Sequence, residues 1–204
     1  MVIFYIFVII CAYIMGSSSM SFYLGKMKGI NIQEKGSKNL GASNAMILMG
    51  WKYGILVGIH DIAKSALAVF LATLFFPELP CIGAVAGVAS VLGHIFPFYL
   101  KFKGGKGFAP YIGMTLALNW KLALVIILLI ILVTLIFDYI VIGTTLTITI
   151  VPAYLGIASH SWVLPAILLI ATVIIIYKHR MNYVRIYKGT EIGFRSANKG
   201  EHRV

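Results

Sequence analysis

Long apolar runs, separated from one another by short polar stretches, recur along the whole of this 204-residue chain. Only 11% of its residues are charged, against about 25% in an ordinary soluble domain. A segment that crosses hydrocarbon has to satisfy its backbone hydrogen bonds internally, and a helix does so. The sequence therefore predicts an all-α, polytopic integral membrane protein. We expect residues 1–204 to form a single membrane-embedded domain, with no separate soluble domain.

About seven runs are candidates for membrane-spanning helices. They cover residues 2–15, 47–76, 81–100, 108–120, 122–137, 140–158 and 161–177. The run 108–120 is shorter than the ~20 residues that a helix needs to cross hydrocarbon about 30 Å thick. If residues 108–137 formed one span, the basic C-terminal tail would lie outside, against the positive-inside rule. Two spans, the first of them short, place the C-terminus in the cytoplasm.

Positive charge dominates the polar stretches, and the formal net charge of the chain is +11. Lys26 is the first basic residue, and Lys28, Lys35 and Lys38 follow it closely. This asymmetry predicts that the N-terminus lies outside and that the first polar loop is cytoplasmic. It also predicts that the first run is a membrane anchor rather than a cleaved signal peptide. Cytoplasmic loops account for the positive charge, so we expect no nucleic-acid partner.

The polar stretch 93–108 reads GHIFPFYLKFKGGKGF, with lysines and glycines interleaved at residues 103–107. Glycine lets backbone N–H groups come close to a ligand, and successive N–H groups of this kind form a concave anion site. Apolar sequence resumes at Phe108, where the start of a helix would add partial positive charge. The stretch therefore predicts a phosphate or carboxylate site. A basic loop that only flanks a membrane span explains the spacing equally well.

Ionisable residues also lie within or beside the apolar runs. Asp61 and Lys64, which follow His60, are three residues apart and so share one helix face. We favour a structural ion pair over a catalytic role for them. A lone histidine at the end of a span, such as His94, is typical of packing or hydrogen bonding. The Thr144 hydroxyl is expected to bond the carbonyl of the preceding turn, with a substrate contact as the alternative.

Three polar clusters share the cytoplasmic face if the N-terminus lies outside. They are residues 17–44, 94–107 and 178–191, and they contain glycines, small hydroxyls, amides and cations but few carboxylates. This composition predicts an anion site at the membrane surface, without metal ligands.

The three clusters, taken in order, resemble the bacterial acyl-phosphate:glycerol-3-phosphate acyltransferases, the PlsY family of integral membrane enzymes. The first motif is Gly16-Ser17 followed by residues 35–44, KGSKNLGASN, where the family has GSGNxGATN. The second runs from Gly93-His94 through FKGGKG at residues 102–107. The third is HRMN at residues 179–182, then Arg185 and GTE at residues 189–191. The resemblance covers nearly the whole chain.

The resemblance implies transfer of a fatty acyl group from an acyl phosphate to the 1-hydroxyl of glycerol 3-phosphate. The products are lysophosphatidate and phosphate, in phospholipid synthesis. It implies a multi-pass protein of the bacterial plasma membrane whose active site faces the cytoplasm. The partners would be the two substrates and membrane lipids, with no cofactor and no metal.

The resemblance also assigns roles to residues. Those expected at the reacting centre are Ser37, Lys106, Thr144, His179 and Asn182. Those expected to bind substrate are Ser17, Lys38, Asn39, Gly41, Asn44, His94, Lys103, Gly104, Gly105 and Gly107. Glu191 is expected to be a structural partner, as are Asp61 and Lys64. His179 is either the general base or an orienting group, and the phosphate of the donor is the alternative proton acceptor.

Three departures from the family pattern bear on the acceptor and on activity. Asn31-Ile32-Gln33 stands where the family has Asp-Ile-Arg, Ile47 stands in place of an arginine, and Lys38 in place of a glycine. The loss of two cations weakens phosphate binding by a few kcal/mol unless another group, such as Lys38, replaces them. The alternatives are therefore a non-catalytic scaffold or lipid-binding paralogue, and an acyltransferase with another polyol phosphate as acceptor.

Overall fold

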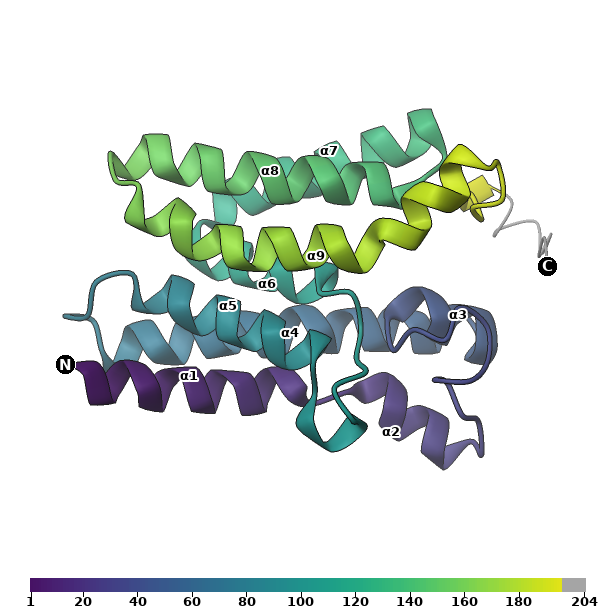
Figure 1. Cartoon of the computed structure of the whole chain (residues 1–204), viewed down its shortest axis with the longest axis horizontal. Helices are drawn as coiled ribbons and strands as arrows, with labels where there is room; N and C mark the ends of the chain where they lie inside the picture. Colours follow the sequence, from purple (N-terminus) through teal and green to yellow (C-terminus); the bar gives the residue numbers. More distant parts are fainter. Residues whose placement is uncertain (196–204) are drawn as a thin grey trace. The chain divides into compact units, whose positions relative to one another are not determined.

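Helices account for the regular secondary structure of residues 1–195, the part of the chain that this computed structural model describes (Figure 1). Lys199 and Arg203 of the basic tail lie outside the described residues. Six helices there are long and apolar enough to cross a membrane, and Phe108–Leu118 is a shorter apolar helix. These helices confirm the predicted all-α membrane fold, and the fourth, short run is a helix. The chain divides into two compact units, unit 1 being Met1–Leu118 and unit 2 beginning at Asn119.

Unit 1 is built around helix α5, which contacts α1, α4 and α6. Its helices are α1 (Val2–Ser17), α2 (Met20–Met27), α3 (Ala42–Met49), α4 (Trp51–Phe75), α5 (Ile82–Ile95), the short 3₁₀ helix η1 (Phe98–Leu100) and α6 (Phe108–Leu118). A Cβ at Gly16 would overlap the backbone of Ser90, and a Cβ at Gly93 would overlap the backbone of Tyr13. Helices α1 and α5 therefore pack closely because glycine lets their backbones approach.

Two breaks between helices in unit 1 lie beside the first predicted motif, one between α1 and α2 and one between α3 and α4. The first apolar run ends at Ser17, and the Ser19 hydroxyl then caps α2 by accepting from the N–H of Phe22. The predicted span 47–76 is wrong as a single helix, because Gly50 has φ +99° and separates α3 from α4. The predicted long loop 25–46 is correspondingly shorter, because α2 and α3 include its two ends and leave residues 28–41 between them.

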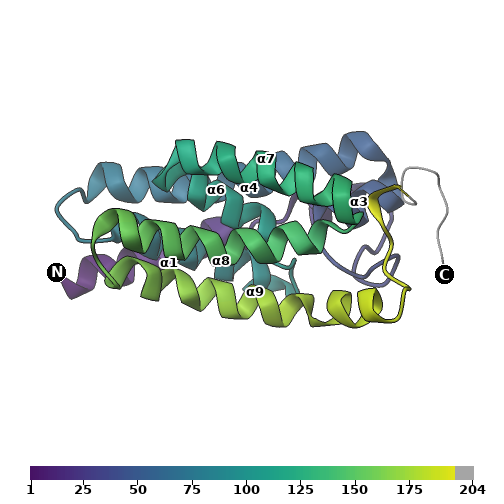
Figure 2. The ribbon, with the colours of Figure 1, turned by 90° about the horizontal axis from the view of Figure 1, so that it is seen from above.

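The described residues of unit 2 form the helices α7 (Trp120–Phe137), α8 (Ile140–Ser159) and α9 (Val163–Tyr187). Helix α8 packs against both α7 and α9, and Figure 2 shows α8 and α9 side by side. The side chain of Asn119 caps α7 by accepting from the N–H of Leu122 at 2.9 Å. Asp138 and His160 adopt left-handed conformations in the two short turns.

Helix α9 continues well beyond the predicted end of the last span at residue 177. The expected tail from Lys178 to Arg185 is helical, which corrects the prediction. The reason is a stripe at helical spacing, because Thr172, Ile175, His179 and Asn182 are all buried on one face. The apolar face of the span therefore continues into polar residues without a change of period.

Candidate functional site

Asn44 in the first turn of α3 organises the loop of residues 28–41, here called the N-terminal loop. Its side chain is fully buried. Its Nδ2 donates to the carbonyls of Ile32 at 3.1 Å and Lys35 at 3.2 Å, and its Oδ1 accepts from the N–H of Ser37 at 2.9 Å. Gly36 has φ +60°, and a Cβ there would overlap Asn44 Oδ1. The loop is therefore folded over one amide, which leaves Ser37 exposed.

A small apolar cluster and one hydroxyl fix the rest of the N-terminal loop. Ile32 and Leu40 pack with Leu100, which follows far along the chain. Ser21 in α2 donates to the carbonyl of Leu40 at 2.9 Å. Lys38, which stands where the family has glycine, has φ +58° and is exposed. These contacts fix the N-terminal loop, and Ser37 and Lys38 lie on its exposed surface.

Replacement of Asn44 by alanine is expected to release the N-terminal loop, because three backbone groups lose their partners. We expect unfolding in detergent to become easier by about 1–3 kcal/mol, and amide exchange across residues 31–37 to accelerate. The matched control is Asn31→Ala, an exposed asparagine of the same loop, with an effect within about 0.5 kcal/mol. Equal effects of the two substitutions would contradict the assignment.

The second loop, residues 101–107, is called the glycine-rich loop, and it folds back on the end of α5. The N–H of Gly104 donates to the carbonyl of Ile95, and the N–H of Gly105 donates to the carbonyl of His94, both at 3.1 Å. These two N–H groups are therefore not the anion donors that the sequence predicted. Helix α6 begins at Phe108 as expected, directly after Gly107 at φ +93°. The groups of this loop that remain suited to an anion are its lysines and the positive end of α6.

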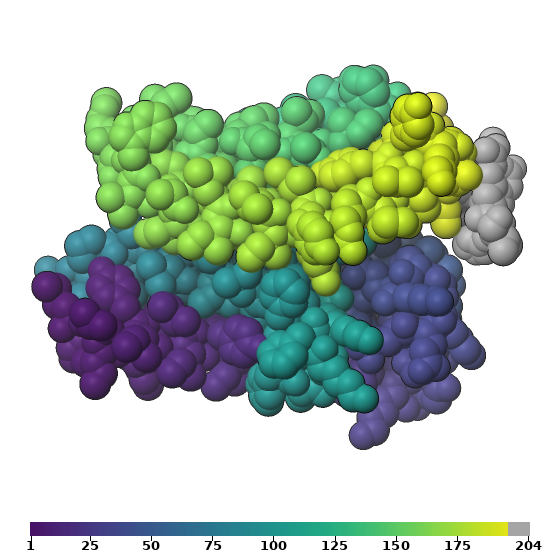
Figure 3. Space-filling view, in the orientation of Figure 1, coloured from purple at the N-terminus to yellow at the C-terminus, as the bar shows by residue number. Residues whose placement is uncertain are grey.

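Gln33 joins the two loops. Its Nε2 donates to the carbonyl of Lys103 at 2.9 Å, across 70 positions of sequence. Gln33, which stands where the family has arginine, thus holds the N-terminal loop beside the glycine-rich loop. Figure 3 shows the teal side chains around residue 100 on the surface of unit 1, between those of α1 in purple and the violet segment that follows α2. The first two motifs therefore meet within unit 1.

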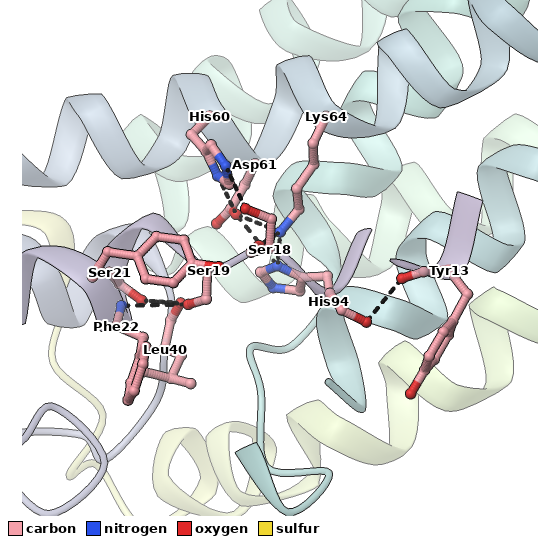
Figure 4. A network of polar contacts seen from close by, with 12 residues as sticks. Tyr13, Ser18, Ser19, Ser21, Phe22, Leu40, His60, Asp61, Lys64 and His94 are labelled. Carbon is pink, nitrogen blue, oxygen red and sulfur yellow. Dashed lines mark hydrogen bonds and ion pairs between the residues drawn. The ribbon is translucent and has the colours of Figure 1, made fainter. Parts of the chain in front are cut away.

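A buried polar network lies behind the glycine-rich loop (Figure 4). The Nζ of Lys64 is 2.8 Å from Asp61 Oδ1, 2.7 Å from the carbonyl oxygen of Ser18 and 2.9 Å from His94 Nδ1. The structure thus contains the ion pair that the spacing of Asp61 and Lys64 predicts. The His94 ring is also 3.4 Å from Asp61 Oδ1, and all three side chains are buried.

Further hydrogen bonds tie the break between α1 and α2 to the same region. The Ser18 hydroxyl is 3.1 Å from His60 Nε2. The hydroxyl of Tyr99 donates to the carbonyl of Ser17 at 2.9 Å, and that of Tyr13 donates to the carbonyl of Phe96 at 2.6 Å. Ser17, expected to bind substrate, is itself buried, and its hydroxyl donates to the carbonyl of Tyr13. The α1–α2 break and the end of α5 are therefore held together.

In unit 2 the third motif lies along the last turns of α9. The Nδ1 of His179 is 2.9 Å from the carbonyl oxygen of Ile175. A carbonyl only accepts, so Nδ1 carries a proton and donates it to this bond. Glu191 folds back from beyond the helix and accepts from Asn182 Nδ2 and from Arg185 Nε. The carboxylate thus orients the amide of Asn182.

The start of α8 lies beside the end of α9. The hydroxyls of Thr145 and Tyr183 are 2.8 Å apart and join the two helices there. Thr144 is buried, and its hydroxyl donates to the carbonyl of Ile140 at 3.1 Å, the bond that was expected of it. Unit 2 therefore collects Thr144, His179 and Asn182 at one end of its helices.

Some residues of these sites were not identified as such from the sequence. Gln33 was noted only as a departure from the family pattern, and neither Ser18 nor His60 was assigned a role. The bonds of Ser18 and Gln33 join elements distant in sequence, so no local spacing indicates them. Within residues 1–195, no group of His, Cys, Asp and Glu side chains is placed to hold a metal ion. Apart from the paired carboxylates of Asp61 and Glu191, the side chains that are gathered are cations, amides, hydroxyls and imidazoles, which are groups suited to phosphates.

Comparison with known proteins gives consistent similarities over both units. The family model described as glycerol-3-phosphate acyltransferase matches residues 6–189. The chain is 36% identical to glycerol-3-phosphate acyltransferase 1 of Oceanobacillus iheyensis, over 90% of this chain and 91% of the relative. It is 38% identical to the glycerol-3-phosphate acyltransferase of Trichlorobacter lovleyi, over 91% of this chain and 95% of the relative.

Two crystal structures of PlsY (YgiH), an integral membrane glycerol 3-phosphate acyltransferase, share the fold. The glycerol 3-phosphate form superposes with a TM-score of 0.88 at 30% identity and covers 95% of this chain and 97% of its own. The lysophosphatidic acid form gives a TM-score of 0.84 at 31% identity and covers 93% of this chain and 95% of its own.

Proposed function

The chain belongs to the glycerol-3-phosphate acyltransferase family, and on that premise we propose that its acyl donor is an acyl phosphate. It is a membrane-embedded acyltransferase that transfers an acyl group to glycerol 3-phosphate. The match over residues 6–189, which includes both units, carries this conclusion. We propose that both units contribute residues to the activity, as expected of a single acyltransferase domain.

The groups in the two units suit the reaction with an acyl phosphate. The 1-hydroxyl oxygen of glycerol 3-phosphate forms a bond to the acyl carbonyl carbon, and the bond from that carbon to the phosphate oxygen breaks. The hydroxyl proton passes to a base, and phosphate leaves with its electron pair. His179 is our candidate base, and the phosphate of the donor is the alternative. Lys106 and the start of α6 would stabilise the phosphate charge.

The remaining predicted residues take supporting roles in this proposal. Ser37, at the exposed surface of the N-terminal loop, is proposed to contact the acceptor, with Lys38 and Asn39 beside it. Asn182, oriented by Glu191, and Thr144 are proposed to bind substrate oxygens. Asn44 holds the loop from beneath. Direct contact between Asn44 and a substrate remains a prediction.

We further propose that this is a protein of the bacterial plasma membrane whose active site faces the cytoplasm. The support is the distribution of charge in unit 1. Exposed lysines gather in the segments 26–38 and 101–103, whereas the N-terminus lies at the other end of α1 from α2 (Figure 1). The positive-inside rule then places the lysine-rich end in the cytoplasm and the N-terminus outside.

Turnover by the purified, detergent-solubilised full-length protein tests the donor and the acceptor together. Palmitoyl phosphate or palmitoyl-CoA is offered with glycerol 3-phosphate, and lysophosphatidate and phosphate are measured. We expect equal amounts of both products with palmitoyl phosphate, and no transfer from palmitoyl-CoA. Transfer from palmitoyl-CoA alone would refute the proposed donor. Product only with another polyol phosphate would reveal a changed acceptor, and no product with any acceptor from folded protein would indicate a non-catalytic scaffold.

Replacement of His179 by alanine is expected to lower kcat by about 10²–10⁴-fold if His179 is the base. The measurement is initial phosphate release at saturating palmitoyl phosphate and glycerol 3-phosphate. His160→Ala is the matched control, because His160 lies exposed in the α8–α9 turn. Near-normal turnover by the His179 variant would rule out both its basic and its orienting role, and would leave the phosphate of the donor as the proton acceptor.

A further inference from the structure

His94 contacts the glycine-rich loop with both its backbone and its ring. Its carbonyl accepts from the N–H of Gly105 at 3.1 Å. Gly105 lies so close to the imidazole that a Cβ added there would overlap Nε2, Cε1 and Cδ2 of the ring. Gly105 is itself buried. The residue before Lys106 is therefore in direct contact with the Nε2 edge of the His94 ring.

The opposite edge of the His94 ring faces the buried ion pair. Its Nδ1 is 2.9 Å from Lys64 Nζ and 3.4 Å from Asp61 Oδ1. Lys64 is in turn bound to the carbonyl of Ser18 at the α1–α2 break. The ring is thus held on one edge by charged groups of α4 (Figure 4), and its other edge contacts Gly105 of the loop.

Burial of such a network is costly, and apolar residues of similar volume often give equal or greater stability. The network instead fixes the orientation of the His94 ring. A hydrogen-bonded ring has one orientation, whereas an apolar side chain at the same place would have several rotamers. The N–H bonds of Gly104 and Gly105 to the carbonyls of Ile95 and His94 fix the loop backbone as far as the residue before Lys106, and the ring contact adds a second constraint on Gly105. Because Lys106 follows Gly105 directly, the contact between Gly105 and His94 also determines where the Lys106 backbone lies.

We propose that His94 is a positioning residue of the acyltransferase, which transmits the geometry of the Asp61–Lys64 pair to the glycine-rich loop and so places Lys106. This inference rests on the proposed function of Lys106 in phosphate binding. It replaces the expectation that His94 itself binds substrate. The two roles differ in their consequences, because a positioning residue acts through the loop and a substrate ligand does not.

Gly105 and His94 allow a test by relief of a clash. Gly105→Ala places a methyl group into the ring and is expected to reduce kcat/KM about 10²-fold, since the loop must move. In a His94→Ala background the same methyl group meets no ring. The double variant His94→Ala/Gly105→Ala should therefore be no less active than His94→Ala alone. This is a non-additive result expected only of residues in contact.

Gly104→Ala is the matched control for the double variant. A Cβ at Gly104 would overlap backbone carbonyls of His94 and Ile95 and the ring of Pro97, none of which is removed by His94→Ala. The effects of Gly104→Ala and His94→Ala should therefore add. His94→Asn keeps an amide group near the position of Nδ1 but lacks the Nε2 edge that contacts Gly105, so it should be about as inactive as His94→Ala.

Amide exchange of the full-length protein in detergent supplies a readout that does not depend on turnover. In His94→Ala, peptides covering residues 101–107 should exchange faster than in the wild type, whereas peptides of α4 should not. His94→Asn, which also lacks the ring edge against Gly105, should show the same faster exchange in the loop. Unchanged exchange in the loop of His94→Ala would overturn the inference, and so would wild-type kcat/KM in a variant whose loop exchanges faster.

Failure of the proposed function is distinguishable from failure of this inference. A wild-type protein that releases no phosphate with any acceptor would refute the function, and with it the catalytic role of the positioning. The exchange measurement would still decide whether His94 holds the loop. Normal wild-type turnover together with additive effects of His94→Ala and Gly105→Ala would refute the positioning role alone.

Discussion

Substitution of Lys106 by alanine is expected to reduce acyl transfer by about 10²–10³-fold, the effect of removing one preorganised donor from a developing charge. Lys106 is partly buried and lies between Gly105, which rests on His94, and Gly107, which precedes α6. Its ammonium group would act together with the positive end of α6 on a phosphate. Both kcat and kcat/KM are measured by phosphate release from palmitoyl phosphate.

Lys101→Ala is the matched control, because Lys101 is an exposed lysine of the same loop. Its loss should change turnover little, since an exposed charge is screened by solvent and salt. Equal losses in the two variants would mean that the loop acts through its overall charge. Full activity of Lys106→Ala would remove the glycine-rich loop from the mechanism.

Substitution of Lys64 by methionine is expected to destabilise unit 1 by about 3–5 kcal/mol, because it leaves the carboxylate of Asp61 buried without its cation. Asp61 is 2% exposed, so solvent offers no replacement. The double variant Asp61→Asn/Lys64→Met removes both charges and should recover most of the loss. The free energy of unfolding is measured by denaturation in mixed detergent micelles.

Lys52→Met serves as the control for this pair. Lys52 lies exposed in the first turn of the same helix, where it stacks on the ring of Trp51. Its replacement should change the free energy of unfolding by less than about 1 kcal/mol. A double variant no more stable than Lys64→Met would show that the network contributes more than charge neutralisation.

Much of unit 1 could be predicted from local spacing. The apolar runs identified the helices, and the three-residue separation of Asp61 and Lys64 identified their ion pair. The start of α6 at Phe108 followed from the return of apolar sequence after Gly107. Each of these features depends on neighbours along the chain, and local sequence therefore carries it.

Other predictions were wrong where the local structure depends on a single backbone angle or on a hydrogen-bond partner outside the local segment. Gly50 breaks the second span through its positive φ, although the surrounding residues are apolar enough to continue a helix. The glycines at residues 104 and 105 were expected to expose their N–H groups to an anion. They instead bond the end of α5, because the loop turns back on the helix that precedes it.

The sequence alone determined that this chain is a helical membrane protein with three motifs of an acyltransferase family, since apolar length and motif spacing are local properties. The tertiary structure decided how those motifs are supported. Gln33 reaches Lys103, and Lys64 reaches both Ser18 and His94. These contacts join residues that lie on separate helices and loops, and only the packing of those elements brings their side chains within hydrogen-bonding distance.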